Sequence, residues 1–256
     1  MKINIDNSIL ISAFCECFNM SITELKKELD IRNKRNDRCV KRKVFYAGEL
    51  DWKESASKTD YNSLKNDLYP NYTKHIKEQG LTNILDQLWL RVIKVPRTTR
   101  GLAPYTYIQD NVIKSTGKNY LDYGGSLGIE ALSVSMYFDY VYISDIDINA
   151  FKFSKYLAKN IGIKNFKTIN SDKIKFLNKK HFKCISSIYT MDCFMYNEAV
   201  ERLTYLLKHC DDFYGMWTME NNKQRLKLGE ICAKNVNKTI KRVMPLPRLN
   251  SVTHIY

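Results

Sequence analysis

The feature that most constrains the fold is an alternation of short apolar strands and amphipathic helices that begins near residue 118. Strands alternating with helices build a parallel sheet that is covered on both faces. The strand-like runs occupy 118–124, 140–145, 165–172, 184–192 and 212–218, and the helix-like runs occupy 128–138, 149–162 and 198–210.

Two further strand-like runs, 238–246 and 251–256, follow each other without a helix between them. Such a late hairpin inserts an antiparallel strand into an otherwise parallel sheet. The sequence therefore predicts an α/β fold with a Rossmann-like, mostly parallel, seven-stranded sheet and helices on both faces.

Helical patterns dominate before residue 100. They cover 8–18, 21–30, 61–80 with a break at Pro70, and 81–94, and a connector with two prolines follows over 95–107. Ser21 and Glu24 form a capping-box pattern at the start of the second helix. We expect a mainly helical region over 1–100 and a sheet domain over 101–256.

A glycine-rich turn interrupts the first strand–helix pair. The stretch DYGGSLG, residues 122–128, places Gly124, Gly125 and Gly128 just after Asp122. Open α/β sheets bind ligands at the carboxyl ends of their strands. Glycines there let a ligand approach the backbone, and the helix that follows offers free N–H groups.

The spacing of these glycines discriminates between ligands. A dinucleotide fingerprint, G-x-G-x-x-G, would need glycine at Tyr123, which disfavours a nicotinamide oxidoreductase. Asp122, Gly124 and Gly128 match D-x-G-x-x-x-G, and on these residues the segment 118–256 resembles the class I S-adenosylmethionine-dependent methyltransferases. That family usually has D/E-x-G-x-G-x-G, whereas this chain has Ser126 at the middle glycine and an extra Gly125.

The resemblance implies S-adenosylmethionine as cofactor and a binding residue at each strand end. Asp145 ends its strand near the roughly 20-residue spacing of a ribose-binding acid. The implied cofactor-binding residues are Asp122, Gly124, Gly125, Ser126, Gly128, Asp145, Ile146 on the adenine face, Asp172 against the adenine amino group, and Asp192 beside the transferred methyl. The alternative interpretation is that these aspartates only cap turns and helices.

Catalytic residues are not assigned by the sequence. A sulfonium methyl is already activated, so a general base is optional, and Asp192 and Tyr196 are the candidates. The tetrapeptide of nucleobase amino methylation, D/N-P-P-Y/F, and the Pro-Cys nucleophile of base-carbon methylation are absent, and Cys193 lacks the preceding proline. No CxxC or HxxxH spacing occurs, so we predict no metal site.

The chain is basic, with a formal net charge of +14 and a pI near 9.3. Its densest basic run, 31–43, contains Arg32, Lys34, Arg35, Arg38, Lys41, Arg42 and Lys43. Such a run is typical of a phosphate-tracking arm and equally of a solvated charged loop.

Three functions follow. The favoured one is a methyltransferase for a small-molecule or biosynthetic acceptor, with residues 1–100 as a substrate-recognition or lid region by analogy with the superfamily. The alternatives are a nucleic-acid methyltransferase that uses the basic run, and a non-catalytic Rossmann-like binding subunit. No apolar run reaches the ~20 residues of a membrane helix and no signal peptide is evident, so we expect a cytoplasmic protein without a membrane partner. The sequence assigns no oligomeric state.

Overall fold

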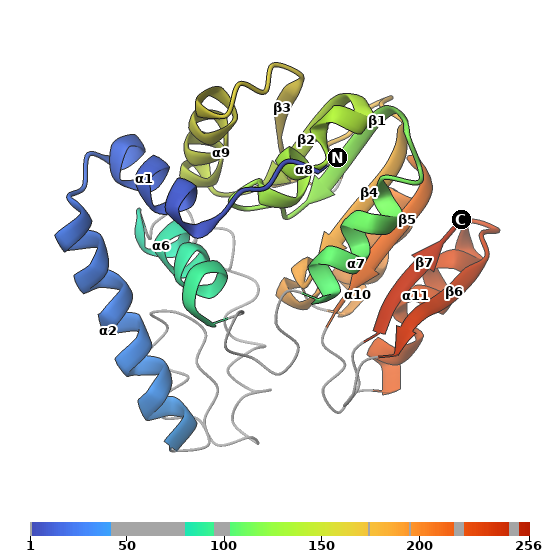
Figure 1. The fold of residues 1–256 in the computed structure, drawn as a ribbon. Helices are drawn as coiled ribbons and strands as arrows, with labels where there is room; N and C mark the ends of the chain where they lie inside the picture. The colour runs from blue at the N-terminus through green and yellow to red at the C-terminus, as the bar shows by residue number, and fades with distance from the viewer. Residues whose placement is uncertain are drawn as a thin grey trace.

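The computed structural model describes residues 2–41, 80–94, 103–173, 175–194, 196–217, 223–245 and 251–256. At its centre is a seven-stranded sheet in the order β3-β2-β1-β4-β5-β7-β6 (Figure 1). The first five strands in sequence are parallel, and β7 is antiparallel to both of its neighbours. This confirms the predicted sheet and its antiparallel hairpin. The strands are β1 (Gly117–Tyr123), β2 (Phe138–Asp145), β3 (Phe166–Asn170), β4 (Phe182–Ile188), β5 (Cys210–Met216), β6 (Ile240–Pro245) and β7 (Ser251–Ile255).

Helices cover both faces of the sheet. Apolar side chains alternate along the strands, so that one set packs against helices on one face and the other set against helices on the opposite face. The first face carries α7 (Ala103–Val112), α8 (Ile129–Ser133), the short helix η4 (Ser135–Tyr137) and α9 (Ile148–Asn160). The second carries α10 (Tyr196–Leu207) and α11 (Lys223–Asn235).

Three amino-terminal helices form a further layer outside α8 and α9 (Figure 1). The rings of Phe14 and Phe153 lie 5.6 Å apart, which joins the first helix to α9. The layer therefore shares a core with the sheet domain, and the division near residue 100 stays a prediction. The helices are α1 (Asn7–Phe18), α2 (Ile22–Lys41) and α6 (Thr82–Trp89).

The capping box is confirmed, but the predicted end of its helix is wrong. Ser21 N–H donates to Glu24 Oε2 over 2.8 Å, and Glu24 N–H donates to Ser21 Oγ over 3.2 Å. The helix was expected to stop at residue 30, whereas α2 runs to Lys41. The reason is that Arg32, which in sequence belongs to a solvated basic run, is fully buried against α6.

Other helix boundaries also differ from those predicted. The helix predicted over 81–94 is α6 followed by a wider π-helix, η2 (Leu90–Lys94), and α7 begins inside the predicted connector. The run 223–235 forms α11, a helix that the sequence analysis missed. The predicted helix over 61–80 and most of the connector lie outside the described residues.

The fourth strand is shorter than its sequence suggested. It ends at Ile188 and not at residue 192, because Tyr189 adopts a left-handed backbone with φ of 60° that stops the strand. The 3₁₀ helix η5 (Thr190–Cys193) follows. The segment after β4 therefore turns back over the carboxyl edge of the sheet.

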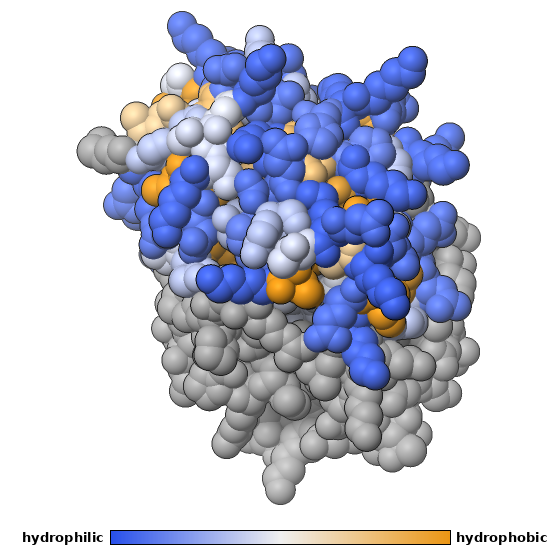
Figure 2. Space-filling view, turned by 90° about the vertical axis from the view of Figure 1, so that its right-hand side faces the viewer, coloured by the Kyte–Doolittle hydropathy of each residue, from blue (hydrophilic) through white to orange (hydrophobic). Residues whose placement is uncertain are grey.

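Within the described ranges, no single helix has the length and apolar character to cross a bilayer. Taken together α1 and α2 pass that test, but the two are bent by 111°. On the side of the molecule that carries β6 and β7, the described surface is mainly hydrophilic with small, scattered apolar areas (Figure 2).

Candidate functional site at the carboxyl edge of the sheet

The glycine-rich loop leaves β1 and folds across the end of β2. The N–H groups of Gly124 and Gly125 both donate to the carbonyl of Ser144, over 2.8 and 3.2 Å. Gly128 then closes the turn by donating to Gly125 O over 2.7 Å. Gly124 and Gly128 have φ of 72° and 77°, the left-handed region that side chains disfavour. The loop thus brings β1 and β2 together at one edge.

At Gly124 the neighbour that requires a bare backbone is part of the protein. A Cβ there would lie 2.1 Å from Thr190 Oγ1, and the Thr190 hydroxyl donates to Tyr123 O over 2.9 Å. From the sequence we expect a ligand as the close neighbour of Gly124, whereas the structure places the segment after β4 there. A ligand contact at Gly124 stays a prediction.

Ser126 occupies the position where the methyltransferase motif usually has its middle glycine. Its φ is 42°, so it adopts the left-handed backbone without being glycine. Its N–H donates to Asp145 Oδ2 over 3.0 Å. Its hydroxyl oxygen is buried and has no hydrogen-bond partner. The loop therefore has a left-handed residue that is not glycine at this position, and it buries one hydroxyl oxygen without a partner.

Asp145 is held by main-chain donors at the end of β2. Its Oδ1 accepts from Ile146 N over 2.7 Å and from Asp147 N over 3.0 Å. Burial raises the pKa of Asp145 to about 6, although these three amides, including that of Ser126, pull the pKa down. The structure thus places three predicted site residues, Ser126, Asp145 and Ile146, in contact at one point of the edge.

Asp122 lies beside them in the core of the edge, with only 3% of its surface exposed. Ser186 Oγ donates to Oδ1 over 3.0 Å, and Tyr120 and Ser186 share a hydrogen bond of 2.6 Å. Oδ2 has no partner. Burial raises the pKa of Asp122 well above its usual range, and the negative charge of Glu130 raises it further.

A polar group that the sequence analysis missed adjoins Asp122. Arg91 Nη1 of η2 lies 3.0 Å from Glu130 Oε1 in the first turn of α8. The Arg91 guanidinium also lies 5.0 Å from the centre of the Tyr105 ring. The only sequence signal for Arg91 was its place in the amphipathic run 81–94, and nothing in the sequence paired it with a carboxylate 39 positions later.

The loop after β3 carries Asp172 and is fastened to the second face by Arg202. Arg202 donates to Ser171 O over 2.9 Å, to Asp172 O over 3.1 Å and to Tyr123 Oη over 3.1 Å. The N–H of Asp172 donates to Asn170 Oδ1 over 2.8 Å. The structure therefore fixes the backbone of this loop next to the end of β1.

The two catalytic candidates lie after β4. Asp192 belongs to η5, but its side chain is outside what the structure describes. Tyr196 begins α10 and is half-buried at the margin of the core on that face. Neither is placed against a reacting group, so both stay predictions.

The basic run is partly committed to contacts within the chain. Arg32 Nε donates to Asp86 Oδ1 over 2.7 Å, and its Nη1 donates to Glu28 Oε2 over 2.7 Å. The exposed Lys34 pairs with Asp30 over 2.7 Å. Arg42 and Lys43 lie outside the described residues, as do the side chains of Arg38 and Lys41.

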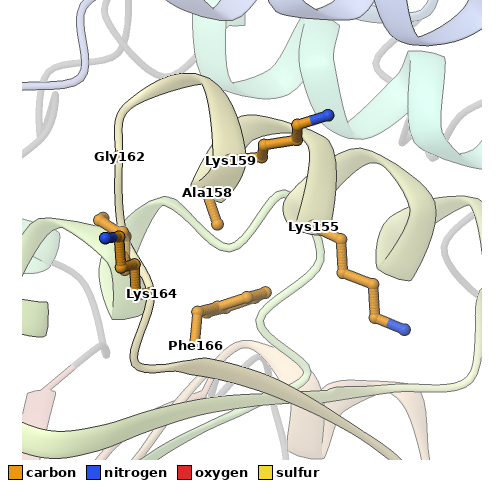
Figure 3. A pocket seen from close by; sticks show the side chains of 7 residues that line it. Lys155, Ala158, Lys159, Gly162, Lys164 and Phe166 are labelled. Carbon is orange, nitrogen blue, oxygen red and sulfur yellow. The ribbon is translucent and has the colours of Figure 1, made fainter.

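A hollow of about 300 Å³ lies away from this edge, where α9 ends and β3 begins. Figure 3 shows Phe166 on its floor, with the ammonium group of Lys159 directed away from it. Since Phe166 is the first residue of β3, the hollow is at the amino ends of the strands and is not part of the candidate site. Among the described residues, no group of three or more His, Cys, Asp or Glu side chains is arranged to hold a metal ion.

Neither a protein-family model nor a curated protein sequence matches the chain. Solved structures do resemble it. An S-adenosylmethionine-dependent methyltransferase from Clostridium acetobutylicum superposes with a TM-score of 0.52 at 9% identity, over 68% of this chain and 97% of that one. Magnesium protoporphyrin IX methyltransferase from Synechocystis, with bound S-adenosylmethionine, superposes with a TM-score of 0.50 at 11% identity, over 78% and 98%. The chain has the fold of the class I S-adenosylmethionine-dependent methyltransferases.

Proposed function

We propose that the chain is an S-adenosylmethionine-dependent methyltransferase that acts on a small-molecule or biosynthetic acceptor. One observation carries this proposal: on a methyltransferase fold, buried polar atoms without hydrogen-bond partners gather at the glycine loop. Each such atom costs about 1–3 kcal/mol when it stays unpaired, and a ligand that supplies partners removes that cost. The atoms are Asp122 Oδ2 and Ser126 Oγ, together with Arg91 Nη1 and Glu130 Oε1, which form an ion pair but no hydrogen bond.

Asp145 is suited to a sugar hydroxyl. Each oxygen of a carboxylate accepts about two hydrogen bonds. Oδ1 already has two, from Ile146 and Asp147, whereas Oδ2 has one, from Ser126. The open position on Oδ2 lies beside Ser126, on the carboxylate to which the resemblance assigns the ribose of the methyl donor.

The donor supplies a methyl group on a positively charged sulfur, so the work of the protein is to orient the two reactants and exclude water. Several elements cover the carboxyl edge of the sheet and can serve both tasks. Thr190 closes over Gly124, and η2 and α7 bring Arg91 and Tyr105 against the same edge. Asp192 and Tyr196 remain the candidates on the acceptor side.

Ion pairs within the basic run favour a small acceptor. Arg32 and Lys34, the first two cations of the basic run, are paired with acids of their own chain. Through η2, the amino-terminal layer borders the carboxyl edge of the sheet, where Arg91 pairs with Glu130. These contacts suit a covered pocket more than an open phosphate-binding track.

Calorimetric titration of the full chain with S-adenosylmethionine tests the cofactor. We expect heat of binding in the wild type and an affinity about tenfold or more weaker in Asp145→Ala, because a charge-assisted hydrogen bond is lost. Asp139→Ala is the matched control, since Asp139 lies on the same strand but is exposed. A wild-type chain that releases no heat would contradict the proposal and leave the non-catalytic binding subunit.

The acceptor is tested with donor labelled on its methyl group. The full chain is incubated with a cell extract, which is then divided into small molecules and nucleic acids. We expect label among the small molecules. Label that stays with RNA or DNA and is released by nuclease contradicts the small acceptor and supports the nucleic-acid alternative.

A further inference from the structure

Arg91 and Glu130 form an ion pair that is buried but incompletely bonded. Their side chains are 17% and 12% exposed, and Nη1 and Oε1 are 3.0 Å apart. Even so, neither atom has a partner in hydrogen-bond geometry. The two charges therefore compensate each other, while the two facing atoms make no hydrogen bond.

The pair lies over the end of β1, beside Asp122. Asp145 ends β2 and Tyr189 follows β4, on opposite sides of β1. Burial raises the pKa values of both Asp122 and Tyr105, and the charge of Glu130 raises both further. Glu130 belongs to α8, which packs on β1 and β2, whereas Tyr105 belongs to α7, which packs on β4, so the cluster spans the end of β1.

We propose that Arg91 and Glu130 bind the amino-acid end of the methyl donor, with the guanidinium receiving its α-carboxylate and the Glu130 carboxylate receiving its α-ammonium. This inference rests on the proposed function. A zwitterion carries one charge of each sign a few bonds apart, and the pair presents one charge of each sign with unfilled donor and acceptor positions. An arginine fork is suited to a carboxylate because its N–H donors match both oxygens.

The secondary structure that carries Arg91 also fits a role in binding. It belongs to the π-helix η2, a widened turn of a kind that is frequent at functional sites. The ring of Tyr105 supports the guanidinium from α7. The amino-terminal layer thus contributes a binding residue to a site whose other residues come from the sheet domain.

Three ligands distinguish binding of the amino-acid end of the donor from binding of its adenosine. S-adenosylmethionine and its demethylated product, S-adenosylhomocysteine, both have the amino-acid end. Methylthioadenosine has the adenosine and the sulfur but lacks that end. Calorimetry measures the affinity of each for the full-length wild type, Arg91→Met, Glu130→Gln and the control Lys155→Met, which removes a cation at the opposite edge.

We expect Arg91→Met to bind S-adenosylhomocysteine about 10- to 100-fold more weakly, the value of a charge-assisted hydrogen bond. Its affinity for methylthioadenosine should stay close to that of the wild type. Glu130→Gln should show the same selectivity with a smaller loss, and Lys155→Met should match the wild type for all three ligands.

The outcomes distinguish the two proposals. No binding of any ligand by the wild type overturns the proposed function. Wild-type affinity of Arg91→Met for S-adenosylhomocysteine, or equal losses for all ligands, overturns the assignment of the pair and leaves the proposed function standing. Circular dichroism verifies folding. If Arg91→Met is unfolded, Arg91→Lys replaces it, and a selective loss is again required because lysine lacks the fork.

Discussion

Two arginine–carboxylate pairs lie buried in or beside the amino-terminal layer, and they are bonded differently. Arg32 donates to Asp86 and Glu28 through well-formed hydrogen bonds. Arg91 Nη1 and Glu130 Oε1 lie 3.0 Å apart, against 2.7 Å in the first pair, and make no hydrogen bond. The first pair holds α2 against α6, and the second adjoins the glycine loop. The hydrogen bonds of the first pair are complete, whereas the second pair, which we propose as a ligand-binding pair, makes none between its facing atoms.

The largest expected effect is loss of stability when the structural pair is broken. Asp86→Ala leaves the buried Arg32 without its main partner and should lower the free energy of unfolding by about 3–5 kcal/mol. Urea denaturation measures the change. Lys34→Ala, which removes an exposed pair, should cost no more than about 0.5 kcal/mol. Similar effects for both variants would contradict the structural role of Arg32.

A somewhat smaller loss is expected at the tightest point of the candidate site. Gly124→Ala puts a side chain on a left-handed backbone and against Thr190, which together should cost about 2–4 kcal/mol. Thr190→Ala in the same chain should recover part of that loss. Urea denaturation of the two single variants and the double variant gives the coupling. Additive effects would mean that the two residues are not in contact.

Donor affinity should depend on pH in a direction set by Asp145. Because its pKa is raised to about 6, the carboxylate begins to take up a proton near pH 6 and then loses its acceptor capacity. The affinity should therefore fall, by up to about tenfold per pH unit, below the pKa. Calorimetry between about pH 8 and pH 5 measures this dependence. Asp145→Asn should bind weakly with a flatter pH profile, and a wild-type affinity that is constant over this range contradicts the role of the carboxylate.

The raised pKa of Asp145 has the opposite effect on the free energy of unfolding: its contribution to stability increases as the pH falls. A raised carboxyl pKa means that the folded state binds the proton more readily than the unfolded state does. The contribution of Asp145 to the free energy of unfolding should therefore rise as the pH falls through about 6. Thermal unfolding of the free protein, compared with Asp145→Asn, isolates that contribution.

The smallest expected effect completes the comparison of the two pairs. Glu130→Gln removes a charge that repels Asp122, and it breaks no well-formed hydrogen bond. Arg91 loses its compensating charge, but the repulsion on Asp122 is relieved, so the free energy of unfolding should fall by less than the loss of about 3–5 kcal/mol expected for Asp86→Ala. Urea denaturation beside Asp86→Ala measures the contrast. A loss as large as that of Asp86→Ala would show that the Arg91 pair is structural as well.

Much of the fold follows from local pattern. The strand–helix alternation predicted seven strands and the antiparallel hairpin, because the strand runs are apolar and are separated by turn signals. The helix α11 was missed because its polar run 223–235 shows little amphipathic pattern, so its place depends on packing against α10. The end of α2 was missed because a basic run looks solvated until Asp86 is known to face Arg32.

Contacts within the candidate site were predicted where they are local and missed where they depend on tertiary structure. Asp145 and Ser126 follow from the strand end and the glycine motif, and the structure brings them into contact. Arg91, Tyr105 and Glu130 come from three separate helices, so no spacing reveals them. Thr190 beside Gly124 was also unpredictable, because the left-handed turn at Tyr189 shortens β4 and sends the chain back over the loop.

Arg202 has a consequence for how this protein can evolve. A single guanidinium on α10 fastens Tyr123 at the end of β1 and the backbone of the loop that carries Asp172. The helix that begins at Tyr196 and the loop that carries Asp172 therefore share one anchor. A lineage that reshapes one of them must also accommodate the other.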